Sequence, residues 1–344
     1  MIKDILKNVM MGIHLSQAEA STVLSEIIDG DVTDAQVSAL LIALAMKGET
    51  VDELAGFAAV MRQRAAHFPT KHKLFVDTSG TGGDSKGTFN ISTTAAFVIA
   101  GAGVPVAKHG NRAVSSRSGS ADILNELGVK ITLSPQAAGR CLDQIGICFM
   151  FAPAFHAATK RVAEIRRQLG VRTAFNLLGP LTNPAKTPRQ LVGVFSRAGM
   201  EKCAHVLAQL GTERAWVVWG SDGLDEITLS DTTHVAEVNA GKVKLFELSP
   251  KDFGFDPIRE EAIVGGTPKE NAQILIEILS NSRNDAIKSV VLANAAAVLY
   301  LCDRAKTLKE GVELASDTIA QGQALEKLEQ LITLSNSPEN PINE

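Results

Sequence analysis

The sequence predicts an α/β fold, in which a mainly parallel central sheet is covered by helices and a small all-helical domain is attached. Three observations indicate this fold. Over residues 1–66, apolar residues recur at helical spacing. From Lys73 onward, strand-like and helical segments alternate, which is typical of βαβ units with parallel strands. The chain has 344 residues, more than one compact core usually holds, so we expect one large and one smaller domain.

The N-terminal region is expected to form helices over residues 2–11, 18–28, 35–46 and 54–61. Three of these helices begin with a capping box, a hydroxyl residue followed three positions later by Glu or Gln. The pairs are Ser16 with Glu19, Thr33 with Gln36, and Thr50 with Glu53. Gly30 and Gly48 stand just past two helix ends, where a left-handed residue is favoured.

The alternating region begins with a predicted strand and continues to the C-terminal helices. Strands are expected over residues 74–80, 104–110, 129–133, 147–153, 190–196 and 214–221. Helices are expected over residues 91–103 and 120–127, from Ser134 to Gly146, and up to Leu210. Residues 232–248 predict a β-hairpin that turns at residues 239–241. Residues 268–334 return to helices.

A helical stretch at residues 155–183 interrupts the α/β region. We expect it to pack with the N-terminal helices, so that the small domain is discontinuous and consists of residues 1–66 joined by about 155–185. The α/β domain then comprises residues 73–154 and 186–344. The active site is expected in the cleft between the two domains.

The composition, with 45 % hydrophobic and 21 % charged residues, is ordinary for a globular enzyme. The formal net charge of −4 and the lack of a basic tail argue against nucleic acid as the main partner. The longest apolar run, around residues 290–302, is interrupted by Asn294 and is too short to span a bilayer.

The cysteines share no CxxC spacing and predict buried free thiols of a reducing compartment. They are Cys141, Cys148, Cys203 and Cys302. With no signal peptide at the N-terminus, we expect a cytoplasmic protein that binds neither nucleic acid nor membranes.

A glycine-rich segment, DTSGTGGDSKGTFNISTTAA at residues 77–96, lies between a predicted strand and a predicted helix. In parallel sheets this is where anionic ligands bind, because bare backbone N–H groups can approach their oxygens. The segment is no Walker loop, since Thr88 and Phe89 stand where Lys and a hydroxyl residue are needed. It is no dinucleotide fingerprint either, since Ser85 replaces the third glycine. A tight turn with helix caps is the alternative interpretation.

A second loop, KHGNRAVSSRSGSAD at residues 108–122, follows the next strand and comes to the same edge of the sheet. It contributes Lys108, Arg112, Arg117 and several serines. One loop rich in N–H donors beside one cationic loop suits a polyphosphate better than a single phosphate. Together the two loops favour a diphosphate ligand over the simple turn.

Two adjacent carboxylates, Asp225 and Glu226, follow the strand predicted at residues 214–221 and reach the same edge. Facing a diphosphate, they would repel it unless a hard cation lay between them. Mg²⁺ is typically held by one or two carboxylates together with phosphate oxygens. The pair therefore predicts a Mg²⁺ site, with Ser92 as a further oxygen ligand. An acidic surface turn is the alternative.

Five segments together resemble the anthranilate phosphoribosyltransferases, in the expected order and over nearly the whole chain. They are GTGGD at 80–84, NIST at 90–93, KHGNRAVSSRSGSAD at 108–122, RRQLGVRTAFNLLGPLTNP at 166–184 and DGLDEIT at 222–228. The resemblance implies the fold of the class II nucleoside phosphorylases and a homodimer joined through the helical domain. Ala157 departs from the pattern, because members of the family commonly carry proline there.

The resemblance also implies the reaction. Anthranilate and 5-phosphoribosyl 1-diphosphate would give N-(5-phosphoribosyl)anthranilate and diphosphate, the second step of tryptophan biosynthesis, with up to two Mg²⁺ ions per monomer. The phosphoribosyl diphosphate would be bound by Gly80, Gly83, Asp84, Thr88, Asn90, Ile91, Ser92, Thr93, Lys108, His109, Gly110, Asn111, Arg112, Ala113, Val114, Ser115, Ser116 and Ser120. Anthranilate would contact Gly80, Asn111 and Arg166. Ser92, Asp225 and Glu226 would hold the metal.

Displacement of diphosphate passes through an oxocarbenium-like centre, so the catalyst must stabilise the charge that grows on the leaving group. Lys108 and backbone donors can do this without covalent chemistry. His109 is a candidate general base, but we expect it to form a pocket wall or a hydrogen-bond partner, because an aniline loses its proton easily after attack. A planar carboxylate suits the guanidinium of Arg166.

Two other functions remain open from the residues. A pyrimidine nucleoside phosphorylase would share the fold and the anion loops, but would not need the metal pair formed by Asp225 and Glu226. A non-catalytic nucleic-acid-binding relative would share the fold alone, and the net charge argues against it.

Overall fold

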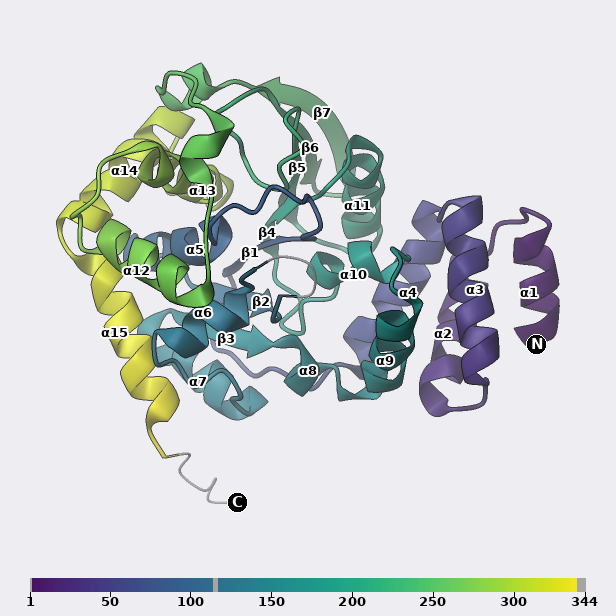
Figure 1. Cartoon of the computed structure of the whole chain (residues 1–344). Coiled ribbons are helices and arrows are strands. Elements are labelled where there is room, and N and C mark those ends of the chain that lie inside the picture. Colours follow the sequence, from purple (N-terminus) through teal and green to yellow (C-terminus); the bar gives the residue numbers. More distant parts are fainter. Residues whose placement is uncertain (1, 114–116, 339–344) are drawn as a thin grey trace.

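The computed structural model describes residues 2–113 and 117–338 and contains one mixed sheet, helices on both of its faces, and a helical bundle at one side (Figure 1). The strands are β1 (Val76–Gly80), β2 (Val106–Gly110), β3 (Ile147–Phe151), β4 (Arg189–Gly193), β5 (Arg214–Gly220), β6 (Thr233–Asn239) and β7 (Lys242–Leu248). Their order is β3-β2-β1-β4-β5-β6-β7. The pairs from β3 to β5 are parallel and the last two are antiparallel. The predicted fold class is confirmed.

The helices lie close to their predicted positions. The N-terminal ones are α1 (Ile2–Met10), α2 (Gln17–Asp29), α3 (Asp34–Lys47) and α4 (Val51–Arg64). Those of the central region are α5 (Ile91–Gly101), α6 (Ser120–Glu126), α7 (Pro135–Ile145), α8 (Ala152–Phe155), η1 (Ala157–Thr159), α9 (Lys160–Leu169), α10 (Phe175–Leu181) and α11 (Arg197–Gln209). The remaining ones are η2 (Pro250–Phe253), η3 (Glu260–Ile263), α12 (Pro268–Leu279), α13 (Ala286–Leu301), α14 (Leu308–Ala320) and α15 (Gln323–Asn336).

Local chemistry explains where the N-terminal helices begin. All three predicted capping boxes form, with the hydroxyl accepting from the backbone of the third helical residue and that residue's side chain reaching back. Gly30 ends α2 in the left-handed conformation, at φ 92°. The predicted hairpin is also confirmed, since Ala240 and Gly241 both have positive φ, as a two-residue turn of this kind requires.

One predicted strand is wrong. Residues 129–133 were expected to join the sheet, but they form no strand. The alternating side chains of Val129, Ile131 and Leu133 are buried in the main core, which is what the pattern detected. The backbone pairs elsewhere, because the Lys130 amide donates to the Ser335 hydroxyl on α15 at 3.1 Å. Alternating burial thus arose from packing against a helix rather than from strand pairing.

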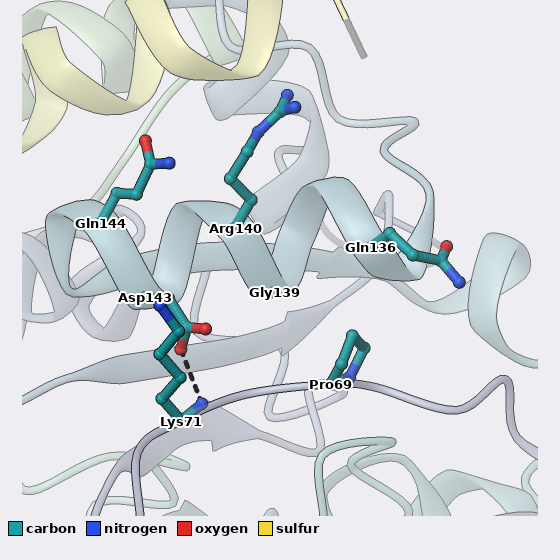
Figure 2. Close-up of a pocket in the computed structure, with 7 residues that line it drawn as sticks. All are labelled: Pro69, Lys71, Gln136, Gly139, Arg140, Asp143 and Gln144. Carbon is teal, nitrogen blue, oxygen red and sulfur yellow. Dashed lines mark hydrogen bonds between the residues drawn. The ribbon is translucent and has the colours of Figure 1, made fainter. Parts of the chain in front are cut away.

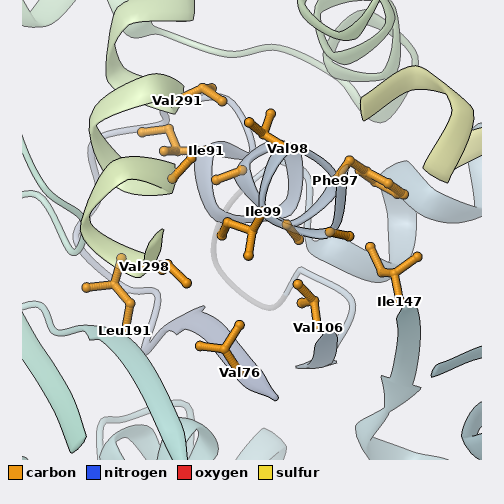
Figure 3. Close-up of a cluster of buried hydrophobic side chains, with 14 of the residues drawn as sticks. Val76, Ile91, Phe97, Val98, Ile99, Val106, Ile147, Leu191, Val291 and Val298 are labelled. Carbon is orange, nitrogen blue, oxygen red and sulfur yellow. The ribbon is translucent and has the colours of Figure 1, made fainter. Parts of the chain in front are cut away.

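The two faces of the sheet belong to two hydrophobic clusters. In Figure 3, α5 and α13 carry Ile99 and Val298 toward Val76 and Leu191 of the strands. The opposite face packs against α11, which in turn contacts α4 of the bundle. Within the described residues, no helix is both long and apolar enough to cross a membrane.

The segment at 155–185 contacts the N-terminal helices. Helix α9 packs against α2 and α3, and α10 packs against α4 (Figure 1). Arg161 of α9 forms an ion pair with Asp34 of α3. Arg62, almost completely buried on α4, donates from Nε to the Leu181 carbonyl at 2.7 Å. These contacts support the predicted discontinuous domain, whose boundaries stay a prediction.

Strand β1 has β2 on one side and β4 on the other, so the connections leave it in opposite directions. At such a switch point, the loops after the strands part and leave room for a ligand at the carboxyl ends. The loops that follow β1, β2 and β5 are the three segments in which the sequence predicted ligand chemistry. The topology therefore brings all three to one edge.

Candidate active site

The glycine loop after β1 approaches the carboxylate segment closely. A Cβ atom on Gly80 would lie 2.4 Å from the Asp225 Oδ2 atom, and one on Gly193 would lie 1.5 Å from the Asp225 carbonyl oxygen. Only glycine fits at both positions. The Gly82 amide, at a φ of 64°, then donates to Asp225 Oδ2 at 2.7 Å. The first and third predicted segments are thus in direct contact.

A segment before α12 holds the other end of the glycine loop. The Gly265 amide donates to the Gly87 carbonyl at 2.8 Å, and Lys86 forms an ion pair with Glu260 at 2.8 Å. The loop is therefore fixed at both ends, which reduces the entropy that a bound ligand would remove.

The second loop is organised by Asp122 at the start of α6. Its carboxylate accepts from the amides of Ala113 and Gly119 at 2.9 and 3.0 Å, and pairs with Arg112 at 2.8 Å. These bonds lower the pKa of Asp122, although burial opposes them. Arg112, predicted as a phosphate ligand, is therefore already paired. The predicted ligands Val114, Ser115 and Ser116 lie outside the described residues.

Asn90 joins the two anion loops. Its Nδ2 donates to the Ser118 carbonyl at 3.1 Å, and its Oδ1 accepts from Asn271 of α12 at 3.0 Å. Nearby, Thr93 donates to the Ser120 hydroxyl at 3.1 Å. The structure brings these three predicted ligands together but uses their side chains to connect the loops. The Ile91 side chain lies in the hydrophobic core (Figure 3), so only its backbone could reach a ligand.

The carboxylates Asp225 and Glu226 are both buried at this edge. Burial raises the pKa of Asp225 well above its ordinary value, and the charges of Asp84 and Glu226 add to the effect. Burial likewise raises the pKa of Glu226 to about 7, against the attraction of Lys108 and a bond from the Ser92 amide at 3.2 Å. Asp84 Oδ2 is buried without a hydrogen-bond partner. The site thus holds more negative charge than the protein compensates.

This charge excess fits a divalent cation. The described residues contain no group of three or more His, Cys, Asp or Glu side chains that could hold a metal by themselves. Mg²⁺ commonly takes only one or two carboxylates and completes its shell with phosphate oxygens and water. The orphaned oxygen of Asp84 and the raised pKa values of Asp225 and Glu226 are what such an ion would relieve.

Lys108 is the buried cation of the site. Its Nζ donates to the Thr78 carbonyl at 2.6 Å and lies 3.4 Å from the Ser92 hydroxyl. Burial lowers its pKa, whereas the carboxylates of Asp77 and Glu226 raise it. An ammonium has three donors, so a third remains for a ligand oxygen.

His109 and His156 form an edge-to-face pair with ring centroids 5.3 Å apart. Burial, with a smaller effect of the neighbouring His156, lowers the pKa of His109 to about 3, although a bond to the Gly179 carbonyl opposes both. Burial also lowers the pKa of His156. Both rings are therefore neutral near pH 7, and both Nε2 atoms are buried without a partner in the protein.

Arg166 and its neighbour Arg167 lie in different surroundings. Arg167 is exposed and pairs with Glu164 on the same helix. Arg166 is half-buried over the Phe175 ring, 5.3 Å from its centroid, and its Nε has no partner. Burial lowers its pKa. Asn111, which the family resemblance groups with Arg166, is exposed at the start of the second loop and accepts from the Arg112 amide at 2.8 Å.

The chain is similar to known proteins over nearly its whole length. The family described as "Glycosyl transferase family, a/b domain" matches residues 72–325, and "Glycosyl transferase family, helical bundle domain" matches residues 3–65. A protein of Moorella thermoacetica named "Anthranilate phosphoribosyltransferase" is 50 % identical, over 96 % of this chain and 98 % of its own length. The chain belongs to the anthranilate phosphoribosyltransferase family.

Two solved structures of anthranilate phosphoribosyltransferases are also similar. That from Thermus thermophilus has a TM-score of 0.91 and 40 % identity, over 96 % of this chain and 99 % of its own. That from Saccharomyces cerevisiae, in complex with PRPP and Mg, has a TM-score of 0.90 and 30 % identity, with 98 % of both chains covered.

The sequence did not predict several residues that lie at the candidate site. Arg172, between α9 and α10, donates to the Gly83 carbonyl and lies over the Phe195 ring, 4.3 Å from its centroid. Asp77 and Asn183 are both buried, and Asn183 donates to Asp77 at 2.8 Å. A charged residue within the apolar strand LFVDTSG was the available signal for Asp77. Arg172 had no such signal, because its partners are distant in the sequence.

A separate pocket of about 260 Å³ lies beside α7, away from the anthranilate phosphoribosyltransferase motifs. Figure 2 shows Arg140 and Gln144 pointing to one side of this helix, and Lys71 and Asp143 lying on the other. Asp143 is occupied by bonds from Thr70 and the Lys71 amide. Because its charged side chains diverge, this pocket is not the candidate site.

Proposed function

We propose that this chain transfers the phosphoribosyl group of 5-phosphoribosyl 1-diphosphate to the amine of anthranilate. The observation that carries the proposal is the contact of three distant segments at one sheet edge. There, Gly82 donates to Asp225, and Lys108 lies between Ser92 and the Thr78 carbonyl. Donors for a diphosphate and acids for a cation thus occupy one place. The family's name agrees with this reaction.

The diphosphate would lie between the two anion loops. The glycine loop offers backbone N–H groups, the N-terminus of α5 offers the residues 90–93, and Lys108 offers an ammonium. We assign the remaining residues predicted from the resemblance to the same ligand. Asn90, Arg112 and Ser120 act mainly by shaping the loops, because their side chains are already bonded.

Anthranilate would lie on the side of segment 155–185. Arg166 would bind its carboxylate, since a guanidinium can donate two parallel hydrogen bonds to a planar carboxylate. Gly80 and Asn111 would contact the ring, as predicted. His109 and His156 each have an unpartnered Nε2 that can accept from the amine. The substrates would thus meet between the glycine loop and this helical segment.

Asp225, Glu226 and Ser92 would hold Mg²⁺, with up to two ions per monomer and Asp84 close enough to influence both carboxylates. When bound, Mg²⁺ supplies positive charge to the oxygens of the leaving diphosphate. The protein's own part is to fix the carboxylates, which it does through Gly82 and the Ser92 amide.

Catalysis by the chain itself then consists of orientation and charge stabilisation. Lys108 donates to the leaving group as its negative charge grows. Arg166 and the two histidines hold the amine in line with C1 of ribose, so that no nucleophilic side chain is required. His109 is a poor general base, because its pKa lies at about 3. The amine's proton leaves to solvent or diphosphate after attack.

A homodimer through the helical bundle is also proposed. The described surface of the bundle exposes four large apolar residues, which we call the methionine patch. They are Met10, Met11, Ile13 and Met46. Lys47 contacts His14 at 2.8 Å, so the ends of α1 and α3 that carry the patch lie together. An exposed cluster of large apolar side chains is typical of an interface.

The decisive test is to mix the purified protein with anthranilate, phosphoribosyl diphosphate and Mg²⁺ and to follow the fluorescence of anthranilate. We expect it to decline, and to decline at least a hundredfold more slowly in the variant Asp225→Asn with Glu226→Gln. If the wild-type rate does not depend on Mg²⁺, Asp225 and Glu226 do not form the proposed metal site. Phosphorolysis of a pyrimidine nucleoside without metal would instead support a nucleoside phosphorylase.

A further inference from the structure

Strands β1 and β2 stay side by side, but their hydrogen-bond ladder has a gap toward their carboxyl ends, near the candidate site. The structure pairs β1 with β4 at all five positions, but pairs β1 with β2 only at Val76 and Val106, although both strands are described in full. Parallel strands normally continue such pairing along their length. Backbone groups in the gap therefore need other partners.

Three polar side chains fill this gap. The His109 amide donates to Asp77 Oδ1 at 3.2 Å, and Lys108 Nζ donates to the Thr78 carbonyl at 2.6 Å. Asn183 Nδ2 donates both to Asp77 Oδ2 at 2.8 Å and to the Ala107 carbonyl at 3.0 Å. Each of these backbone groups, which lie where the ladder is interrupted, is thus satisfied by a side chain.

Asp77 is completely buried, its Oδ1 accepts from the amide of His109, the residue next to Lys108, and its charge raises the pKa of Lys108. A buried ammonium is stable only with a countercharge nearby. Glu226 is the other carboxylate that attracts Lys108, but Glu226 is one of the residues proposed for Mg²⁺. Asp77 is therefore the acid that remains to balance Lys108 when the site is loaded.

We infer that Asp77 is a positioning residue that acts through Lys108 and holds its ammonium toward the diphosphate, with Asn183 fixing the carboxylate. The inference rests on the proposed function. Asn183 follows α10, so its bond to Asp77 connects the helical segment proposed to bind anthranilate to strand β1, whose loop is proposed to bind the diphosphate.

The test is a double-mutant cycle of Asp77→Asn and Lys108→Met, assayed at saturating Mg²⁺. Asp77→Asn keeps an acceptor for the His109 amide but removes the charge. Alone, it should lower kcat/KM for phosphoribosyl diphosphate at least tenfold and change the anthranilate KM less than threefold. In the Lys108→Met background, Asp77→Asn should lower kcat/KM less than threefold, since the ammonium on which Asp77 acts is absent.

Glu53→Gln is the matched control. Glu53 is also a completely buried carboxylate that accepts from two backbone amides, those of Leu15 and Thr50, and from a lysine, Lys47. It lies in the bundle, so its variant should lower Tm and leave kcat/KM unchanged. If Asp77→Asn has equal effects in both lysine backgrounds, or merely lowers Tm as Glu53→Gln does, Asp77 is structural and the inference is wrong.

A second variant covers the case in which Asp77→Asn does not fold. Asn183→Ser removes the amide that holds Asp77 and keeps its charge. It should lower kcat/KM for phosphoribosyl diphosphate about threefold or more, and that loss should vanish in Lys108→Met; equal losses in both backgrounds would again overturn the inference. If Lys108→Met keeps full activity, the proposed site itself has failed, which is a different result.

Discussion

At the residue scale, the half-buried guanidinium of Arg166 is the clearest candidate for substrate selection. It stacks over Phe175, and its Nε lacks a partner, so a carboxylate would complete its bonding. We expect Arg166→Ala to raise the KM for anthranilate at least tenfold and that for phosphoribosyl diphosphate less than threefold. Arg167→Ala is the matched control, because Arg167 is exposed and pairs with Glu164. Equal effects on both substrates would contradict the assignment.

His109 gives a prediction about pH and stability. Its pKa of about 3 in the folded chain lies below the ordinary 6.5, so the unfolded state binds more protons between these values. Stability contributed by the neutral ring is present above pH 6.5 and is lost as the pH falls toward 3. At pH 5 the loss is about 2 kcal/mol of unfolding free energy.

Glu226 changes the unfolding free energy with pH in the opposite direction to His109, so the measurement must separate the contributions of the two groups. Its pKa of about 7 is raised from 4.5, so its contribution is full below pH 4.5 and is lost as the pH rises through 7. The quantity to measure is the difference in unfolding free energy between wild type and His109→Asn, by urea denaturation at pH 5 and pH 7.5. When the pH is lowered from 7.5 to 5, the wild type should lose more unfolding free energy than His109→Asn. A constant difference would mean that the His109 ring is not held neutral.

At the scale of elements, α13 supports the carboxylate loop from beneath. Asn294, the residue that interrupts its apolar run, accepts from the Ile227 amide at 3.1 Å and donates to the Ile227 carbonyl at 3.0 Å. Ile227 directly follows Glu226. One buried side chain thus holds the peptide next to the acids, as a neighbouring strand would.

We expect Asn294→Leu to raise the Mg²⁺ concentration for half-maximal activity about tenfold, with little change in the anthranilate KM. Binding of Mn²⁺ in the presence of phosphoribosyl diphosphate, followed by electron paramagnetic resonance, should weaken in parallel. Thr318→Val is the control, since Thr318 is a buried polar residue of α14 that bonds only within its own helix among the contacts described. Normal Mn²⁺ binding in Asn294→Leu would reduce Asn294 to a structural role.

Elements with a local cause were predictable from the sequence. The capping boxes fixed three helix starts, and the hairpin turn at Ala240 followed from the residues around it. The strand expected at residues 129–133 failed because burial against α15 produces the same alternation as a sheet. Local patterns detect which side chains are buried, but they do not identify the element against which those side chains pack.

The site shows the same limit. Loops after parallel strands meet at one edge by topology, so Gly80, Lys108 and Asp225 could be grouped without coordinates. The roles of Asn90 and Arg112 could not be predicted from the sequence. Their side chains are bonded to Ser118, Asn271 and Asp122, which only the folded chain brings near. The residues that support a site are determined by packing over long sequence distances, and Asp77 and Asn183 belong to this group.

At the scale of the whole molecule, the two hydrophobic clusters show how the bundle is attached. One cluster runs from α1–α4 through α10 and α11 to the strands β4–β6. The other fills the opposite face of the sheet. Because bundle and sheet share an apolar cluster, the helical segment at 155–185 is held firmly beside the glycine loop, which the Arg172–Gly83 bond also joins. The sequence predicted this association only from the order of its elements.

The methionine patch belongs to α1, the turn after it and α3, and Figure 1 shows α1 and α3 on the side of the bundle that faces away from the sheet. Met46 is 84 % exposed and Met11 is 69 % exposed, which is unfavourable unless a second copy covers them. We expect Met11→Asp with Met46→Asp to halve the mass measured by sedimentation equilibrium, because carboxylates cannot be buried in an apolar interface. The matched control is Leu245→Asp on the edge strand β7, where the side chain is 50 % exposed. Dissociation by Leu245→Asp but not by the methionine variant would move the dimer interface from the bundle to the sheet edge.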